Sequence, residues 1–96
     1  MNIKFERADL ISRSLGARYR RQVLSALEND RQVVFDFSQV TFVSDLFADE
    51  LFGILAKKLG LITFKKQVKI LGISSSSAHT LAVNIDNRIK SQVVAA

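Results

Sequence analysis

Cysteine and proline are both absent from this chain of 96 residues, and histidine occurs once. Without cysteine there is no disulfide framework and no thiolate metal site. The four glycines are scattered, so the chain has no glycine-rich phosphate-binding loop. No apolar run approaches the roughly 18–20 residues of a membrane span, and the N-terminus lacks the apolar segment of a signal peptide. These absences predict a soluble, cytoplasmic protein with no cofactor and no membrane contact.

The composition is that of a globular protein. Hydrophobic residues make up 48% of the chain and charged residues 24%. At this length we expect a single domain over residues 1–96 with one modest core. The net charge of +5 and the pI near 10.0 are compatible with an anionic partner, but we favour cations that decorate solvated faces.

Strand and helix patterns alternate along the chain. Ile3 and Phe5 alternate with charged residues, which is typical of a half-buried edge strand. Strands are predicted at about residues 2–7, 33–37 and 68–73, and helices at about 12–28, 45–59 and 75–91. This order predicts an α/β fold, β-α-β-α-β-α, in which helices cover a mainly parallel sheet of three to four strands.

The centre of the chain is the stretch Val33–Lys58. Its first five residues, VVFDF, are nearly all apolar, which is typical of a central strand covered on both faces. Phe42 is then expected to fill the core beneath the next helix. That helix begins at Ser44 or Asp45, and Gly60 is well placed to end it.

The last third of the chain gives weaker signals. Leu61–Phe64 is predicted to start a strand, and Lys65-Lys66 to form a turn. The serine run that follows residue 73 supplies an N-cap for the third helix. The tail Val93–Ala96 is expected to be frayed.

Few residues could carry chemistry. His79 is the only histidine, and we expect it to be an exposed residue in the first turn of a helix rather than a catalytic base. Asp45, Asp49 and Glu50 form the only acidic cluster, which has no histidine or third ligand beside it to hold a metal. Helix capping and the helix dipole explain these carboxylates more simply. We therefore expect neither catalysis nor a metal site.

Arginines crowd the predicted first helix. Arg13, Arg18 and Arg21 could form a basic surface for nucleic acid, which gives the alternative function of a small nucleic-acid-binding regulator. No helix-turn-helix pattern and no aromatic stacking platform accompany them. The sequence leaves open whether the chain forms a homodimer.

Two stretches resemble a known family. VVFDFSQVTFVSDLFADELFGIL, above all its DFSxV and FADELF segments, and LISRSLGARYRRQVLSALE are similar to the STAS-like domain family of unknown function. The family is related to the sulfate transporter and anti-sigma factor antagonist (STAS) domains, and the resemblance is clearest over residues 10–90. It implies a compact β/α module without enzymatic activity. It also implies a protein partner, with a histidine-kinase-like ATPase in a partner-switching system as the expected class.

The resemblance also points to a surface. In the anti-sigma factor antagonists, a serine or threonine at the start of the helix after the DFSxV segment is phosphorylated, which breaks the partner complex. Here Asp45 stands at that position and Ser44 one place earlier. Asp45 is either a permanent anion that imitates the modified state or, as we favour, the helix cap. The resemblance assigns partner contacts to Ser44, Asp45, Leu46 and Asp49.

Overall fold

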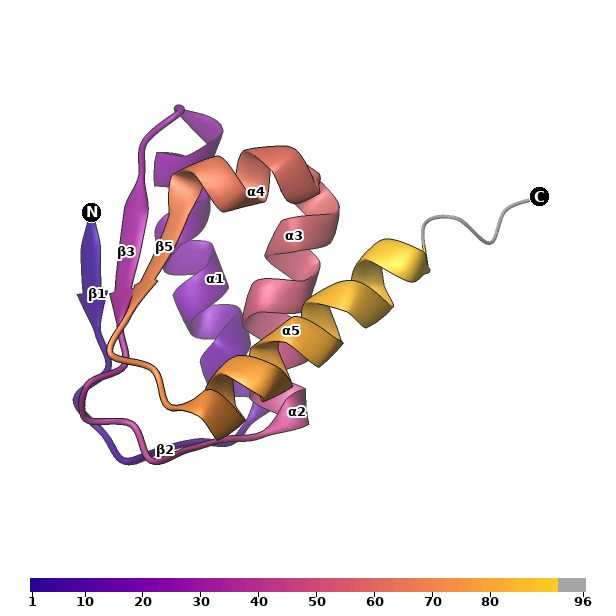
Figure 1. Ribbon diagram of the computed structural model, residues 1–96. Coiled ribbons are helices and arrows are strands. Elements are labelled where there is room, and N and C mark those ends of the chain that lie inside the picture. The colour runs from indigo at the N-terminus through magenta and orange to yellow at the C-terminus, as the bar shows by residue number, and fades with distance from the viewer. Residues whose placement is uncertain (92–96) are drawn as a thin grey trace.

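The computed structural model describes residues 1–91, which fold as alternating strands and helices (Figure 1). The strands are β1 Asn2–Lys4, β2 Asp9–Leu10, β3 Val33–Asp36, β4 Phe42–Val43 and β5 Val68–Leu71. The helices are α1 Arg13–Glu28, α2 Asp45–Ala48, the π-helical turn η1 Asp49–Gly53, α3 Ile54–Leu59, α4 Leu61–Gln67 and α5 Ser75–Lys90. The tail predicted to be frayed, Val93–Ala96, lies outside the described residues.

The main sheet is parallel, and its three strands lie in the order β1-β3-β5. Phe35 in the central strand has Ile3 and Ile70 as its register partners. β1 occupies an edge, as its alternating pattern predicts. β2 and β4 form a separate two-stranded parallel pair. The predicted α/β fold with a mainly parallel sheet is confirmed.

Only one face of the sheet packs on helices (Figure 1). Val33 and Phe35 in β3 are fully buried, whereas Val34 and Asp36 between and after them are only half-buried. The prediction that this strand is covered on both faces is therefore wrong. In the run VVFDF only Val34 and Asp36 point to the second face, and these two residues, one apolar and one charged, do not show whether that face is covered.

An aromatic cluster fills the space between sheet and helices. Seven ring pairs have centroids 4.9 to 6.3 Å apart, most of them edge-to-face. Its members are Phe5, Tyr19, Phe35, Phe37, Phe47 and Phe52. Such pairs add about 0.5–1.5 kcal/mol each to the burial of their area. The cluster joins β1 and β3 to α1, α2 and η1.

Phe42 lies outside this cluster. It is 53% exposed, whereas its neighbour Val43 is 4% exposed and belongs to the core. The pairing of β4 with β2 fixes this alternation, since successive residues of a strand point to opposite faces. The expectation that Phe42 fills the core is wrong.

The segment predicted as a strand and a turn is the helix α4. Phe64 and Gln67 are buried, and their spacing of three residues places both on one helix face. The Gln67 side-chain amide donates to the Leu27 carbonyl at 3.0 Å. Gly60 ends α3, with φ +84° and ψ 147°, a conformation essentially restricted to glycine. The chain turns at that residue and starts α4 immediately.

Replacing each of two phenylalanines by alanine tests these positions. Phe52→Ala removes a fully buried ring and should lower the free energy of unfolding by about 3–5 kcal/mol. Phe42→Ala removes a half-exposed ring and should cost less than about 1 kcal/mol. Urea denaturation followed by circular dichroism measures both. Equal costs would place Phe42 in the core after all.

Candidate functional site

The start of α2 is capped by Ser44. Its side-chain oxygen accepts a hydrogen bond from the Phe47 amide at 3.1 Å, and its backbone is extended, with φ −80° and ψ 159°. The same hydroxyl donates to the Ile11 carbonyl. The cap is thus Ser44 and not Asp45, because an N-cap residue must be extended while Asp45 is already helical.

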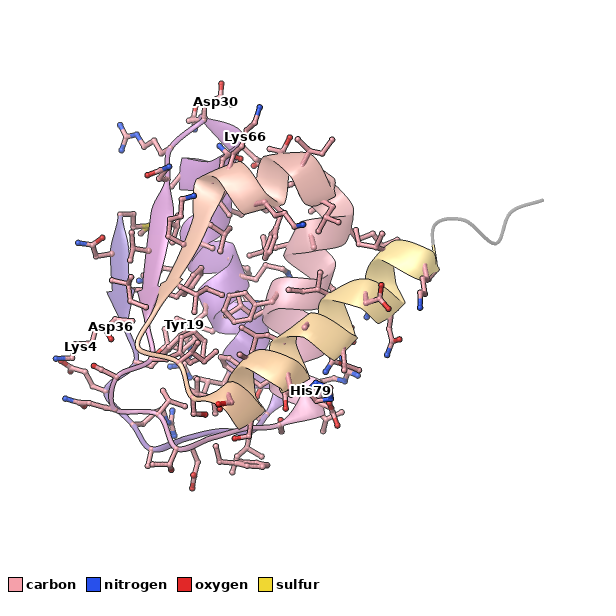
Figure 2. All side chains as sticks on the ribbon, in the orientation of Figure 1. Lys4, Tyr19, Asp30, Asp36, Lys66 and His79 are labelled. Atoms are coloured by element: carbon pink, nitrogen blue, oxygen red, sulfur yellow. The ribbon has the colours of Figure 1, made fainter. Side chains whose placement is uncertain are left out.

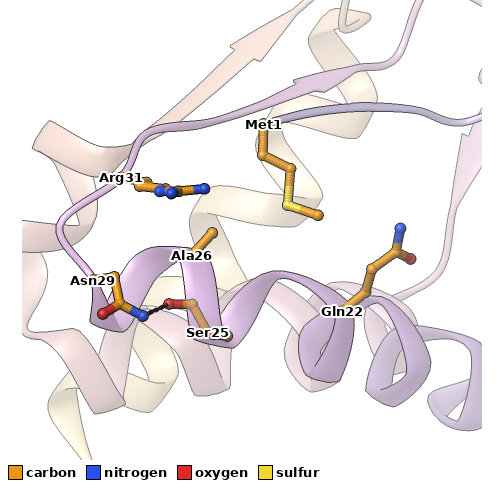
Figure 3. A pocket seen from close by; sticks show the side chains of 6 residues that line it. All are labelled: Met1, Gln22, Ser25, Ala26, Asn29 and Arg31. Atoms are coloured by element: carbon orange, nitrogen blue, oxygen red, sulfur yellow. Dashed lines mark hydrogen bonds between the residues drawn. The ribbon is translucent and has the colours of Figure 1, made fainter.

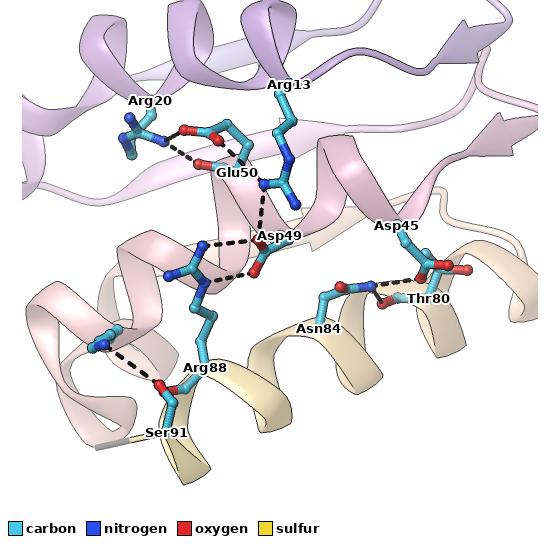
Figure 4. A network of polar contacts seen from close by, with 10 residues as sticks. Arg13, Arg20, Asp45, Asp49, Glu50, Thr80, Asn84, Arg88 and Ser91 are labelled. Carbon is cyan, nitrogen blue, oxygen red and sulfur yellow. Dashed lines mark hydrogen bonds and ion pairs between the residues drawn. The ribbon is translucent and has the colours of Figure 1, made fainter.

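Asp45 turns toward α5 (Figure 4). The Asn84 side-chain amide donates to the Asp45 carboxylate at 2.8 Å and to the Thr80 carbonyl at 2.9 Å. Asn84 is 8% exposed, whereas Asp45 is exposed. A buried amide therefore holds this carboxylate in one place at the molecular surface.

Three large apolar side chains surround the start of α2. Ile11, Phe42 and Leu46 are 52%, 53% and 50% exposed. We call these three residues the α2 apolar patch. Parallel pairing of β2 with β4 brings the chain around Ile11 beside the chain that leads into α2, and the Ser44 amide donates to the Leu10 carbonyl at 2.9 Å. A small cavity of about 80 Å³ lies next to the patch, between Phe42 and Thr80.

The other two carboxylates of the acidic cluster face inward and are paired with arginines (Figure 4). Arg88 of α5 makes a bidentate contact with Asp49, at 2.7 and 2.9 Å. Arg13 of α1 donates to Asp49 at 2.9 Å and to Glu50 at 3.3 Å. Arg20, also of α1, donates to Glu50 at 2.6 Å. The side chains of Asp49 and Glu50 are only 15% and 16% exposed.

These contacts shift the titration of both carboxyls. The hydrogen bond from Arg88 holds the pKa of Asp49 below its usual range, and the hydrogen bond from Arg20 does the same to the pKa of Glu50. In both cases burial opposes the shift and the arginines outweigh it. We call Asp49, Glu50 and these three arginines the ion-pair network.

The backbone of η1 is built around the same contacts. The Ile54 amide, which a regular α-helix would direct to the Glu50 carbonyl, donates to the Asp49 and Leu51 carbonyls instead. Arg20 donates to the Glu50 carbonyl as well as to its carboxylate. A Cβ atom on Gly53 would lie 2.8 Å from the Arg88 side chain, so glycine is required for α5 to approach this closely.

The structure thus divides the residues assigned to partner contact. It places Ser44, Asp45 and Leu46 together at the start of α2, and the Leu46 side chain there is 50% exposed. Asp49 belongs to the ion-pair network. Its assignment as a partner contact stays a prediction, but its carboxylate already has three arginine contacts.

The predicted basic surface is divided too. Arg13 is held by the ion-pair network, whereas Arg18 and Arg21 are exposed on α1. Sequence reasoning missed that Arg20 pairs with Glu50 and that Arg88 pairs with Asp49. A sequence signal for these ion pairs existed. Two adjacent carboxylates, Asp49 and Glu50, lie on a helix with a wide apolar stripe, and a carboxylate that becomes buried on such a helix needs a cationic partner. Nucleic-acid binding through these arginines stays a prediction.

The cavities do not assemble a catalytic set. One cavity of about 600 Å³ lies at the end of α1 between Met1, Gln22 and Arg31 (Figure 3). It contains no acid and no histidine. His79 is exposed on α5, and within residues 1–91 no hydrogen bond or ion pair joins it to another side chain (Figure 2). Those residues also contain no group of three or more acids and histidines placed to hold a metal, and no helix suited to crossing a bilayer.

The ion-pair network predicts a specific pH dependence of stability. Its carboxyls have lower pKa values folded than unfolded, so their stabilising effect is complete above the unfolded values and is lost as pH falls through the folded ones. At pH 7, Asp49→Asn should lower the free energy of unfolding by about 1.5–3 kcal/mol. The difference from wild type should shrink steadily below about pH 4, as denaturation midpoints measured from pH 7 to pH 2 will show.

The matched control is Asp86→Asn. Asp86 pairs with Lys90 four residues on, at 2.9 Å, but the two side chains are 58% and 73% exposed. Its replacement should change the free energy of unfolding by less than about 0.5 kcal/mol at any pH. A pH-independent loss in Asp49→Asn would show that packing, and not the ionised carboxylate, stabilises the three helices.

Comparison with known proteins yields one match. The family described as a STAS-like domain of unknown function matches residues 16–78, roughly two thirds of the chain. The matched segment runs from α1 through α2 to the start of α5, and it contains Arg20, Asp49 and Glu50 of the ion-pair network but not Arg13 or Arg88. No curated protein and no solved structure matches the chain. The chain therefore belongs to the STAS-like domain family of unknown function.

Proposed function

We propose that the protein is a non-catalytic interaction module that docks a protein partner on the α2 apolar patch. The observation that carries this proposal is the half exposure of Ile11, Phe42 and Leu46, three large apolar side chains from separate segments that meet at the start of α2. Apolar side chains gathered on a surface are typical of binding sites. By the family resemblance, Asp45, at the start of the same helix, stands where the related anti-sigma factor antagonists carry their regulatory residue.

The partner is expected to be an ATPase of the histidine-kinase-like fold. This expectation comes from the family resemblance alone. An aromatic ring, a leucine and an isoleucine provide the kind of anchor that commonly carries binding energy at the centre of a protein interface. Asp45 adds one charge at the edge, where it would contribute to orientation and partner choice more than to affinity.

The patch is pre-organised for docking. Ser44 caps α2 and is bonded to Ile11, and Asn84 fixes Asp45. A rigid surface loses less conformational entropy when it binds, so a modest patch can reach a useful affinity. The Ser44 hydroxyl makes two hydrogen bonds that a phosphoryl group would disrupt. We therefore propose that docking needs no phosphorylation at this site.

Capture of the partner tests the proposal. The immobilised wild-type chain is incubated with extract from the cells that produce it, and the bound proteins are identified by mass spectrometry. An ATPase of the histidine-kinase-like fold should be captured. Leu46→Asp should reduce its capture at least about tenfold, because a charge would replace an apolar contact in the interface. Asp45→Lys should reduce capture as well.

The matched control is Ile62→Asp, the same change at an exposed residue far from the patch. It should leave capture unchanged, and circular dichroism should show that both variants fold. Full capture by both Leu46→Asp and Asp45→Lys would rule out this surface. Phosphopeptide analysis after incubation with the captured ATPase and Mg-ATP should find Ser44 unmodified, and a stoichiometric phosphate there would contradict docking without phosphorylation.

A further inference from the structure

The most exposed large apolar side chain in residues 1–91 lies on α4, at the opposite end of the molecule from α2 (Figure 1). Ile62 is 75% exposed, and Leu61 beside it is 37% exposed. Because α4 turns Phe64 and Gln67 inward, Ile62 points away from the protein. Lys65 and Lys66 follow at three and four residues and flank it on the same outer face.

Lysines dominate the charge around Ile62. Residues 54–71 contain five lysines and no carboxylate, and all five lysines are exposed. They are Lys57, Lys58, Lys65, Lys66 and Lys69. We call Leu61, Ile62, Lys65 and Lys66 the α4 surface.

Acidic neighbours from other elements do not cancel this charge. Asp86 of α5 lies across a groove from Lys65, but it is paired with Lys90. Asp30, in the turn after α1, lies at the same end of the molecule as Lys66 (Figure 2). Glu28, the exposed last residue of α1, lies at that end as well, and the exposed Arg31 beside them offsets one of the two carboxylates, so an excess of positive charge remains around α4.

Ile62 is exposed because contacts at both ends of α4 hold the helix in one orientation. Gly60 sets the corner before α4, and the Gln67 amide bonds to the Leu27 carbonyl behind it. The Gln32 side chain donates to the Lys66 carbonyl at 3.1 Å. The fold therefore presents this apolar tip and its lysines to solvent in one orientation.

We propose that the α4 surface binds the interface of a bilayer that contains anionic lipids. A short helix with an apolar tip and flanking lysines matches the chemistry of that interface, where the tip enters the acyl boundary and the ammonium groups meet lipid phosphates. The aliphatic stems of the lysines follow the apolar tip while their charges stay in the headgroup region. This revises the expectation of no membrane contact that came from the sequence.

Other partners fit the α4 surface less well. Lysine is depleted at protein–protein interfaces because holding its flexible side chain costs entropy. Nucleic acid would attract the lysines, but it would gain nothing from Ile62, and the α4 surface has no aromatic ring on which a base could stack. Only the bilayer uses both the charge and the apolar tip.

The expected binding is weak and reversible. Each lysine near an anionic surface strengthens binding by roughly fivefold, and burial of the Ile62 side chain adds about tenfold. The two lysines of α4 and Ile62 together strengthen binding by a factor on the order of 250, which is the effect of a weak, reversible contact. Since the α4 surface and the α2 apolar patch lie at opposite ends, the patch faces away from the bilayer in this orientation (Figure 1).

Vesicle sedimentation tests the proposal. The wild-type chain should pellet with vesicles of equal parts phosphatidylcholine and phosphatidylglycerol, and binding should fall as salt rises. The double variant Lys65→Gln and Lys66→Gln should weaken binding roughly twentyfold. Ile62→Ser, which keeps every charge, should weaken it about fivefold or more. Leu46→Ser, in the α2 apolar patch, is the matched control and should bind like wild type.

Three results would overturn the proposal. The first is no pelleting with the mixed vesicles at low salt, and the second is equal pelleting with pure phosphatidylcholine. The third is wild-type vesicle binding by Ile62→Ser together with gel shifts of duplex DNA that depend on Lys65 and Lys66, which would identify a nucleic-acid surface. None of these results bears on partner capture by the α2 apolar patch, so the two proposals fail separately.

Discussion

The structure depends on two adjacent carboxylates that no single helix can satisfy. Asp49 and Glu50 lie in a helical segment covered by α1 on one side and α5 on the other. Neighbouring residues of a helix point about 100° apart, so the first can reach Arg88 of α5 while the second reaches Arg20 of α1. Removing Arg88 or Arg20 would leave a largely buried carboxylate with only its contact to Arg13, and the loss of a partner at such a site is strongly destabilising. The carboxylates therefore specify how three helices pack.

The π-helical turn η1 lets Arg20 of α1 bond to the backbone of Glu50 as well as to its side chain. In a regular helix the Ile54 amide would donate to the Glu50 carbonyl. Here it donates to the carbonyls of Asp49 and Leu51 instead, which leaves the Glu50 carbonyl without that bond. Arg20 then satisfies both the carbonyl and the carboxylate of Glu50. π-turns are often found at functional sites. Here the local distortion has a structural explanation, since it presents two acceptors to one guanidinium.

Local signals explain what could be predicted from the sequence. The serine caps, the apolar spacing of α1 and α5 and the glycine that ends α3 all act within a few residues, and the structure has them. Pairings such as Arg88 with Asp49, 39 residues apart, depend on how the helices pack. From the sequence, Asp49 and Glu50 are explained by helix capping and the helix dipole, because nothing local shows which arginines will meet them.

The wrong predictions about strands and core residues have a common cause, which is that short apolar runs are ambiguous. Leu61–Phe64 contains three apolar residues in four, a pattern that suits a strand or one turn of a helix equally. The left-handed corner at Gly60 decides for the helix. Phe42 and Val43 are adjacent and both apolar, and only the pairing of β4 with β2 decides which of them is buried.

The position of the ion-pair network also limits what family membership can mean for function. The segment FADELF carries much of the resemblance, and its side chains make internal contacts. Phe47 and Phe52 are core residues, and Asp49 and Glu50 form ion pairs with the neighbouring helices. A match that rests on these residues identifies the fold and its internal contacts. The exposed apolar side chains at the start of α2 and on α4 lie outside this network, so the framework displays them without using them for its own packing.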